Sequence, residues 1–134
     1  MTTQEQTFAQ AVIESTRSFV EELTEAFVRI DDEAFVSDRE REDVEEQLRE
    51  MPLSVMVRDG WRTIGSPSEG PEEFEILLGT GGPARRVIGT LDEHSEPLNA
   101  RYQYQDWFKP WTDGHITGKE GDLIRRFASL FYYE

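Results

Sequence analysis

Four carboxylates recur at every fourth position near the end of the N-terminal third of the chain. They are Asp38, Glu42, Glu46 and Glu50. In a helix this spacing stacks them in one row, about 6 Å apart along the axis. Such a row approximates the charge and spacing of nucleic-acid backbone phosphates, so it could occupy a groove lined with Lys and Arg. Each like-charge pair at i,i+4 costs the helix about 0.2–0.5 kcal/mol, whereas the adjacent row Arg41–Glu45–Arg49 alternates in sign.

Three interpretations of this row remain open. It is a solvated helix face, a mimic of a polyanion that docks on a basic partner, or a site for multivalent cations. Ten of the twenty residues in 31–50 are Asp or Glu. The segment lacks the EF-hand pattern, which counts against cations. A preceding helix adds three outward carboxylates, Glu14, Glu21 and Glu25.

The net charge of −14 is unevenly distributed. Residues 1–52 hold 15 acidic residues and 5 Arg, giving −10, and residues 53–134 hold 13 acidic and 9 basic residues, giving −4. Adaptation to a salt-rich host would instead spread acidity over the whole surface. A negative field repels nucleic acid and anionic membranes and attracts basic surfaces. We therefore expect a basic, nucleic-acid-binding protein as the partner, with no direct contact to nucleic acid or membrane.

Catalytic and metal-binding patterns are scarce. The absence of cysteine excludes disulfides, thiol catalysis and thiolate metal sites. His94 and His115 lack a second His at ligand spacing, and no nucleophile elbow is present. GTGGPARR (79–86) fits no phosphate-loop pattern and lies between two expected strands, which favours a hairpin turn. We expect a non-enzymatic protein without catalytic residues, metal or cofactor.

Two helices are expected to carry the carboxylates. Apolar residues spaced by three, four or seven predict a helix over 5–30; they are Phe8, Val12, Phe19, Leu23, Phe27 and Ile30. Ser37 followed by Glu40 predicts a capping box that opens a second helix. Val44, Leu48 and Met51 form its apolar seam, facing away from the carboxylate row, and Pro52 ends it.

After Pro52 the pattern changes to short β-branched and aromatic segments separated by turn formers. Strands are predicted over 53–57, 74–78, 86–91 and 100–108, with a polar loop at 66–73. Leu123, Phe127, Leu130 and Phe131 predict a closing helix after a Gly-rich lead-in. The expected fold is α+β: two N-terminal acidic helices, an antiparallel meander of about four strands and one C-terminal helix. We expect one domain over 1–134, with an acidic helical part (1–51) and a sheet with the last helix (52–134).

The segment YQYQDWFKPW (102–111) concentrates aromatic residues. Strand alternation places Tyr102, Tyr104 and Phe108 on one face and Trp107 on the other. A core strand packed on the helices is the favoured interpretation, and a protein-binding aromatic patch is the alternative. The sequence shows no secretory signal and no apolar run long enough to cross a bilayer, so we expect a cytoplasmic protein.

Four C-terminal motifs carry a family resemblance: TGGPA (80–84), GTLDE (89–93), YQDWFKPWT (104–112) and FYYE (131–134). Together they resemble small acidic proteins of bacterial phages, plasmids and integrated elements. The resemblance covers roughly the C-terminal half and brings no catalytic residues. It implies proteins of the anti-CRISPR or anti-restriction type, several of which act as DNA mimics. The expected function is inhibition of a host nucleic-acid-binding defence complex. A non-enzymatic adaptor or antitoxin-like module that uses residues 102–111 is the alternative.

Overall fold

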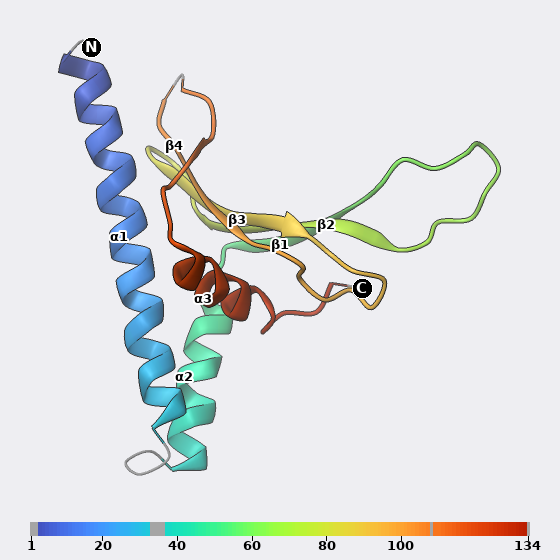
Figure 1. The fold of residues 1–134 in the computed structure, drawn as a ribbon, viewed down its shortest axis with the longest axis horizontal. Coiled ribbons are helices and arrows are strands. Elements are labelled where there is room, and N and C mark those ends of the chain that lie inside the picture. Colours follow the sequence, from blue (N-terminus) through green and yellow to red (C-terminus); the bar gives the residue numbers. More distant parts are fainter. Residues whose placement is uncertain (1–2, 33–36, 108, 134) are drawn as a thin grey trace.

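The structure is a computed structural model that describes residues 3–32, 37–107 and 109–133. Figure 1 shows α1 and α2 side by side, α3 in the angle between α1 and the sheet, and the loop at 60–70 extending away from the helices. The elements are α1 Thr3–Asp31, α2 Asp38–Glu50, β1 Ser54–Asp59, β2 Pro71–Gly79, β3 Ala84–Thr90, β4 Arg101–Gln105, β5 Thr112–Asp113 and α3 Gly118–Ala128.

The strands form one antiparallel sheet in the order β1-β2-β3-β4-β5, so each strand pairs with its neighbour along the chain. This arrangement confirms the predicted α+β class. The sheet has one strand more than expected, because the two residues of β5 pair with Gln103 and Tyr104 of β4. A two-residue strand shows no alternation, so hydrophobic periodicity does not reveal it.

One hydrophobic cluster contains residues of all three helices and of the sheet. Ile76 pairs with Val87, and Val87 with Tyr102, which places the three side chains in a row on the covered face of the sheet. Phe19 of α1 stacks on Tyr102 with 4.9 Å between ring centroids, and it meets Phe127 of α3 edge-on at 5.6 Å. The helices therefore pack on the sheet through aromatic rings.

The predicted apolar stripe of α1 is confirmed, because its residues are buried from Val12 onward and Phe8 is half-buried. Thr16 lies on the same face, and its hydroxyl donates to the carbonyl of Val12 at 2.7 Å. A β-carbon added to Gly114 would lie 2.0 Å from Thr16 Oγ1. The helix thus approaches the chain after β5 as closely as glycine permits.

The second helix begins where the sequence predicts. Ser37 is its N-cap, and its hydroxyl accepts a hydrogen bond from the backbone N–H of Glu40 at 3.2 Å. Val44 and Leu48 are buried, while Met51 is half-buried and caps the C-terminus. The seam is confirmed.

The closing helix is shorter than predicted, because it ends at Ala128. Its C-cap is Ser129, whose hydroxyl donates to the carbonyl of Arg125 at 2.9 Å. Leu130 and Phe131 therefore follow the helix, although both still pack against the core. The apolar spacing of Leu123, Phe127, Leu130 and Phe131 thus predicts the packing of these residues, but not where the helix ends.

Two further boundaries differ from prediction. The expected loop at 66–73 is three residues shorter in the structure, because β2 begins at Pro71, which pairs with Asp59. The fourth strand ends at Gln105, where Asp106 accepts from the backbone N–H of Trp107 at 2.7 Å and turns the chain. Phe108 lies outside the described residues. Among the described helices, none is both long and apolar enough to span a bilayer.

Candidate functional site

The predicted carboxylate row lies along the outer side of α2. Asp38, Glu42, Glu46 and Glu50 are all exposed. The buried seam of Val44 and Leu48 lies on the opposite side of the helix. The row is therefore continuous over the length of α2, with a rise of about 6 Å between successive members.

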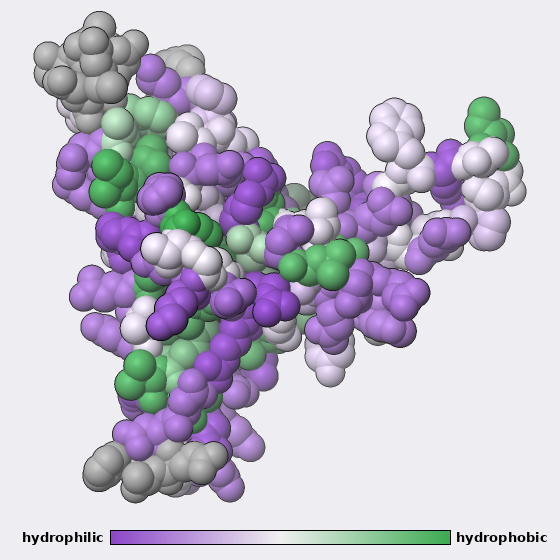
Figure 2. Space-filling view, in the orientation of Figure 1, coloured by the Kyte–Doolittle hydropathy of each residue, from purple (hydrophilic) through white to green (hydrophobic). Residues whose placement is uncertain are grey.

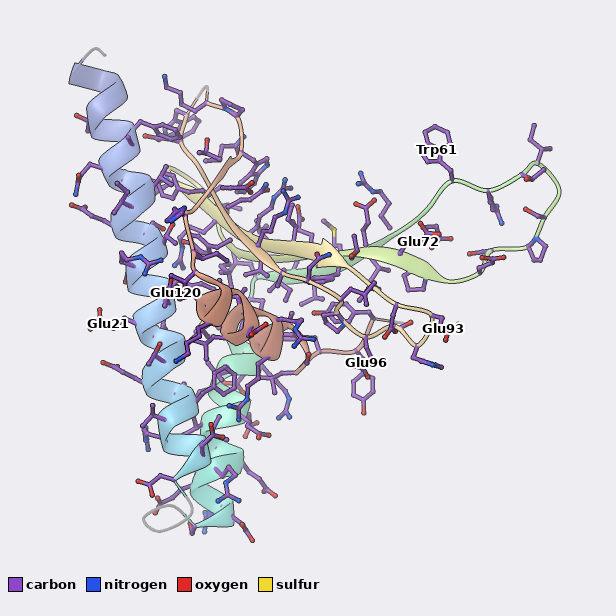
Figure 3. All side chains as sticks on the ribbon, in the orientation of Figure 1. Glu21, Trp61, Glu72, Glu93, Glu96 and Glu120 are labelled. Atoms are coloured by element: carbon purple, nitrogen blue, oxygen red, sulfur yellow. The ribbon has the colours of Figure 1, made fainter. Side chains whose placement is uncertain are left out.

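The three carboxylates predicted on the first helix are exposed as well. Glu21 points away from the body of the molecule in Figure 3. Glu14 accepts a hydrogen bond from the side chain of Gln10 at 3.1 Å, and Glu25 lies one turn beyond Glu21. All three lie opposite the apolar stripe of α1.

The structure does not bring the seven carboxylates together on one face. The two helices pack against each other, and both turn their apolar sides to the same cluster. Arg41 of α2 fixes this contact, because its Nε donates to the carbonyl of Ile30 at 2.8 Å. Each acidic face therefore points away from the shared core on its own helix. The candidate site consists of two separate faces, of which the α2 row is the more regular.

Only part of the negative charge in the α2 row is neutralised by neighbouring basic side chains. Asp38 forms an ion pair with Arg41 at 3.2 Å. Arg39 is also exposed, on the same side as the row. In the described part of the chain, no ion pair involves Glu42, Glu46 or Glu50. Three successive carboxylates thus present their charge to solvent.

The uncovered face of the sheet, on the side away from α1, is different, because its charges are paired. Three ion pairs cross between neighbouring strands there: Arg58–Glu73, Arg86–Glu75 and Arg101–Asp113. Gln103 connects two of them, because it accepts from Arg86 Nε at 2.8 Å and donates to Asp113 at 2.9 Å. The guanidinium of Arg86 also lies over the ring of Trp111, 4.1 Å from its centroid. The uneven charge of the sequence therefore appears in space as open acidic helices beside a balanced sheet.

Salt bridges elsewhere hold the N-terminal helix in place. Arg126 of α3 binds the carboxylate of Asp31 through two hydrogen bonds of 2.6 and 2.8 Å, which lowers the pKa of Asp31. The hydrogen bond from Arg17 to Glu120 lowers the pKa of Glu120 to about 2. These carboxylates fasten α1 to α3.

The strand at the start of the aromatic segment lies in the core, as the favoured interpretation predicts, whereas Trp107, Lys109 and Pro110 after it are exposed. Tyr102 and Tyr104 are buried against α1, where Tyr104 lies 6.0 Å from Phe8 between ring centroids. Trp107 is exposed and follows the strand. The tyrosines are consequently unavailable as a docking surface.

The two histidines lie on different connections. His94 is exposed between β3 and β4, and its Nε2 lies 3.4 Å from Glu93. His115 is exposed before α3, and its backbone carbonyl accepts from Arg17 at 2.9 Å. Within the described residues, no three His, Asp or Glu side chains gather in a metal-binding arrangement.

The loop at 60–70 carries two apolar side chains that the sequence did not lead us to expect at the surface. Trp61 and Ile64 are fully exposed there, and Figure 3 shows Trp61 projecting from the chain. Figure 2 shows apolar atoms at the tip of this loop. The flanking Gly60 and Gly65 indicate a loop, but no pattern in the sequence indicates that these apolar side chains stay uncovered.

The chain matches no protein-family model, and no curated protein or solved structure shows significant similarity to it.

Proposed function

We propose that this chain inhibits a host nucleic-acid-binding defence complex, of the kind targeted by anti-CRISPR and anti-restriction proteins. The carboxylate row of α2 would occupy a Lys/Arg-lined site that otherwise holds DNA or RNA. The observation that carries the proposal is the run of exposed, unneutralised Glu42, Glu46 and Glu50 along one helix. The proposed setting is the cytoplasm, where such complexes act.

The spacing of the row supports mimicry of a polyanion. Carboxylates about 6 Å apart along a straight helix form a rigid line of charge. A basic groove that follows a nucleic-acid backbone binds by neutralising successive phosphates with Lys and Arg. The Ser37 cap and the Val44–Leu48 seam hold the row in place before binding, so the partner does not have to order it.

Electrostatics would govern the association. A net charge of −14 attracts a basic partner over long range and accelerates the encounter. Because the contacts are charge pairs at an exposed surface, affinity should fall steeply as salt is added. Duplex DNA, which carries the same kind of charge, should displace the protein from its target.

The structure favours the row of α2 over the carboxylates of α1 as the contact. Each acidic face lies on the outer side of its own helix, away from the shared core, and the α2 row is the denser line of charge. The alternative adaptor function through residues 102–111 would have to use the exposed Trp107, because Tyr102 and Tyr104 are buried.

A charge-matched pair of variants tests this proposal. The immobilised protein is exposed to host lysate at low salt, and bound complexes are eluted with duplex DNA. Glu42→Lys/Glu46→Lys/Glu50→Lys should lose the DNA-displaceable complex. The control, Glu14→Lys/Glu21→Lys/Glu25→Lys, changes the net charge by the same amount on α1 and should retain it. Equal loss in both variants would show that net charge alone attracts basic proteins and would refute mimicry by α2.

A further inference from the structure

The edge strand β1 is unusually open. It forms one edge of the sheet, and every residue after Ser54 in the strand is exposed. The exposed fractions of its central side chains are 36% for Val55, 54% for Met56 and 42% for Val57. The other edge is β5, which has only two residues. Among the described strands, β1 is thus the one long edge without a partner.

Protein sheets usually protect such an edge with charged side chains, proline or a β-bulge. In β1 the register with β2 stays regular from Ser54 to Arg58 and shifts only between Arg58 and Asp59. Five consecutive residues therefore present an uninterrupted edge with an apolar centre. An edge strand of this kind offers a row of backbone N–H and C=O groups to a further strand.

The five residues are complementary to themselves in the antiparallel direction. Their order is Ser-Val-Met-Val-Arg, with polar residues at both ends. Antiparallel pairing about Met56 puts Met56 opposite its own copy, Val55 opposite Val57, and Ser54 opposite Arg58. No like charges face each other, and paired side chains lie on the same face of the sheet, as antiparallel pairing requires.

The charge distribution permits two copies to meet at this edge. Arg58 is paired with Glu73 on the neighbouring strand, and the uncovered face of the sheet is balanced in charge. The excess negative charge lies on α1 and α2 instead. The face of the sheet that carries Met56 therefore adds no excess charge where β1 would pair.

We propose that β1 is a homodimerisation edge, at which two chains pair antiparallel about a two-fold axis through Met56. The five strands of each copy would then form one continuous sheet of ten. An interface of this type uses the same surface on both subunits and closes on itself. Because the opposite edge ends in the two-residue β5, assembly stops at the dimer. This inference does not rest on the proposed function.

The oligomeric state of the full chain tests the inference. Light scattering coupled to size-exclusion chromatography should give a mass near two copies of the 15.5 kDa chain at high concentration. On dilution the mass should fall toward one copy. Met56→Lys should raise the dimer dissociation constant by about tenfold or more, because it places two like charges directly opposite each other. Trp61→Lys, a lysine at an exposed apolar residue outside β1, should leave the constant unchanged. Far-UV circular dichroism verifies that both variants are folded.

A second pair of variants tests the register. Ser54→Glu faces Arg58 of the other copy and should tighten the dimer, whereas Ser54→Arg should weaken it, and added salt should reduce both effects. A single-chain mass at every concentration would overturn the inference, as would a dimer indifferent to Met56→Lys. Equal effects of the two Ser54 variants would refute the register, and open-ended assembly would refute closure.

Discussion

At the N-terminus of α3, Glu120 accepts hydrogen bonds from two elements at once. Its Oε1 lies 2.9 Å from Arg17 Nη2 of α1 and 2.9 Å from the backbone N of its own N-cap, Thr117. Thr117 in turn accepts from the N–H of Glu120 at 3.2 Å, which completes a capping box. Figure 3 shows Glu120 between α1 and α3. One carboxylate thus starts a helix and joins it to another.

This pair gives a pH-dependent contribution to stability. The Glu120 pKa is lowered to about 2, first by the hydrogen bond from Arg17 and then by that from Thr117. A carboxyl with a lowered folded-state pKa stabilises the fold above its unfolded pKa, near 4.5, and this contribution is lost as the pH falls toward 2.

We therefore expect Glu120→Gln to lower the free energy of unfolding by about 0.5–1 kcal/mol at pH 7, since Arg17 is half exposed and solvent screens the pair. The difference from the unmodified protein should vanish as the pH approaches 2. Urea denaturation at several pH values measures this. Glu21→Gln, at an exposed carboxylate, serves as the control and should show no such trend. A difference that stays constant with pH would contradict the assignment.

At the scale of elements, the close approach of α1 to the chain after β5 depends on Gly114. A β-carbon there would lie 2.0 Å from Oγ1 and 2.7 Å from Cγ2 of Thr16, which is buried inside the helix contact. The backbone N–H of Gly114 also donates to the carbonyl of Tyr102 at 2.9 Å, so this segment cannot shift freely.

We expect Gly114→Ala to lower the free energy of unfolding by about 1–3 kcal/mol through overpacking. Adding Thr16→Ala should recover part of this loss, because it removes the two nearest side-chain atoms. Gly118→Ala is the matched control: its β-carbon would meet open space, so its effect should stay within about 0.5 kcal/mol. Thermal or chemical denaturation compares the unmodified protein, the single variants Gly114→Ala and Thr16→Ala, the double variant and the Gly118→Ala control. Strictly additive effects of the two single substitutions would refute the direct contact.

Repulsion between the carboxylates of the α2 row should measurably lower the free energy of unfolding. Glu46 has a like charge one turn away on each side, Glu42 and Glu50, and it takes part in no ion pair among the described residues. We expect Glu46→Gln to raise the free energy of unfolding by about 0.4–1 kcal/mol, from two relieved repulsions. The same variant should bind the proposed target more weakly. Glu45→Gln is the contrasting control and should destabilise, because Glu45 pairs with Arg49 at 3.3 Å.

On the scale of the whole molecule, the sequence predicts the fold class and the helices well, because their signals are local. Apolar spacing predicts the buried face of α1. Ser37 predicts the start of α2, and Pro52 predicts its end. The strand β5 escapes prediction, because it depends on pairing with β4, which periodicity does not show. The end of α3 at Ala128 differs from the apolar spacing, which continues to Leu130 and Phe131.

Placement of the candidate site is predictable only in part. Helical periodicity correctly puts all seven carboxylates outside, but it cannot show that α1 and α2 turn their acidic faces in different directions. The exposure of Val55, Met56 and Val57 also contradicts what an apolar run indicates, since such a run usually marks a covered strand. Its position at the edge of the sheet is a property of the tertiary fold.

Mimicry by the α2 row is tested by the salt dependence of affinity for the DNA-displaceable complex captured from host lysate. This measurement compares the unmodified protein with Glu42→Lys/Glu46→Lys/Glu50→Lys and with the charge-matched α1 variant. We predict that affinity falls steeply with salt for the unmodified protein and nearly as steeply for the α1 variant, and that binding is lost in the α2 variant. Undiminished affinity of the α2 variant, or binding indifferent to salt, would contradict mimicry by this row.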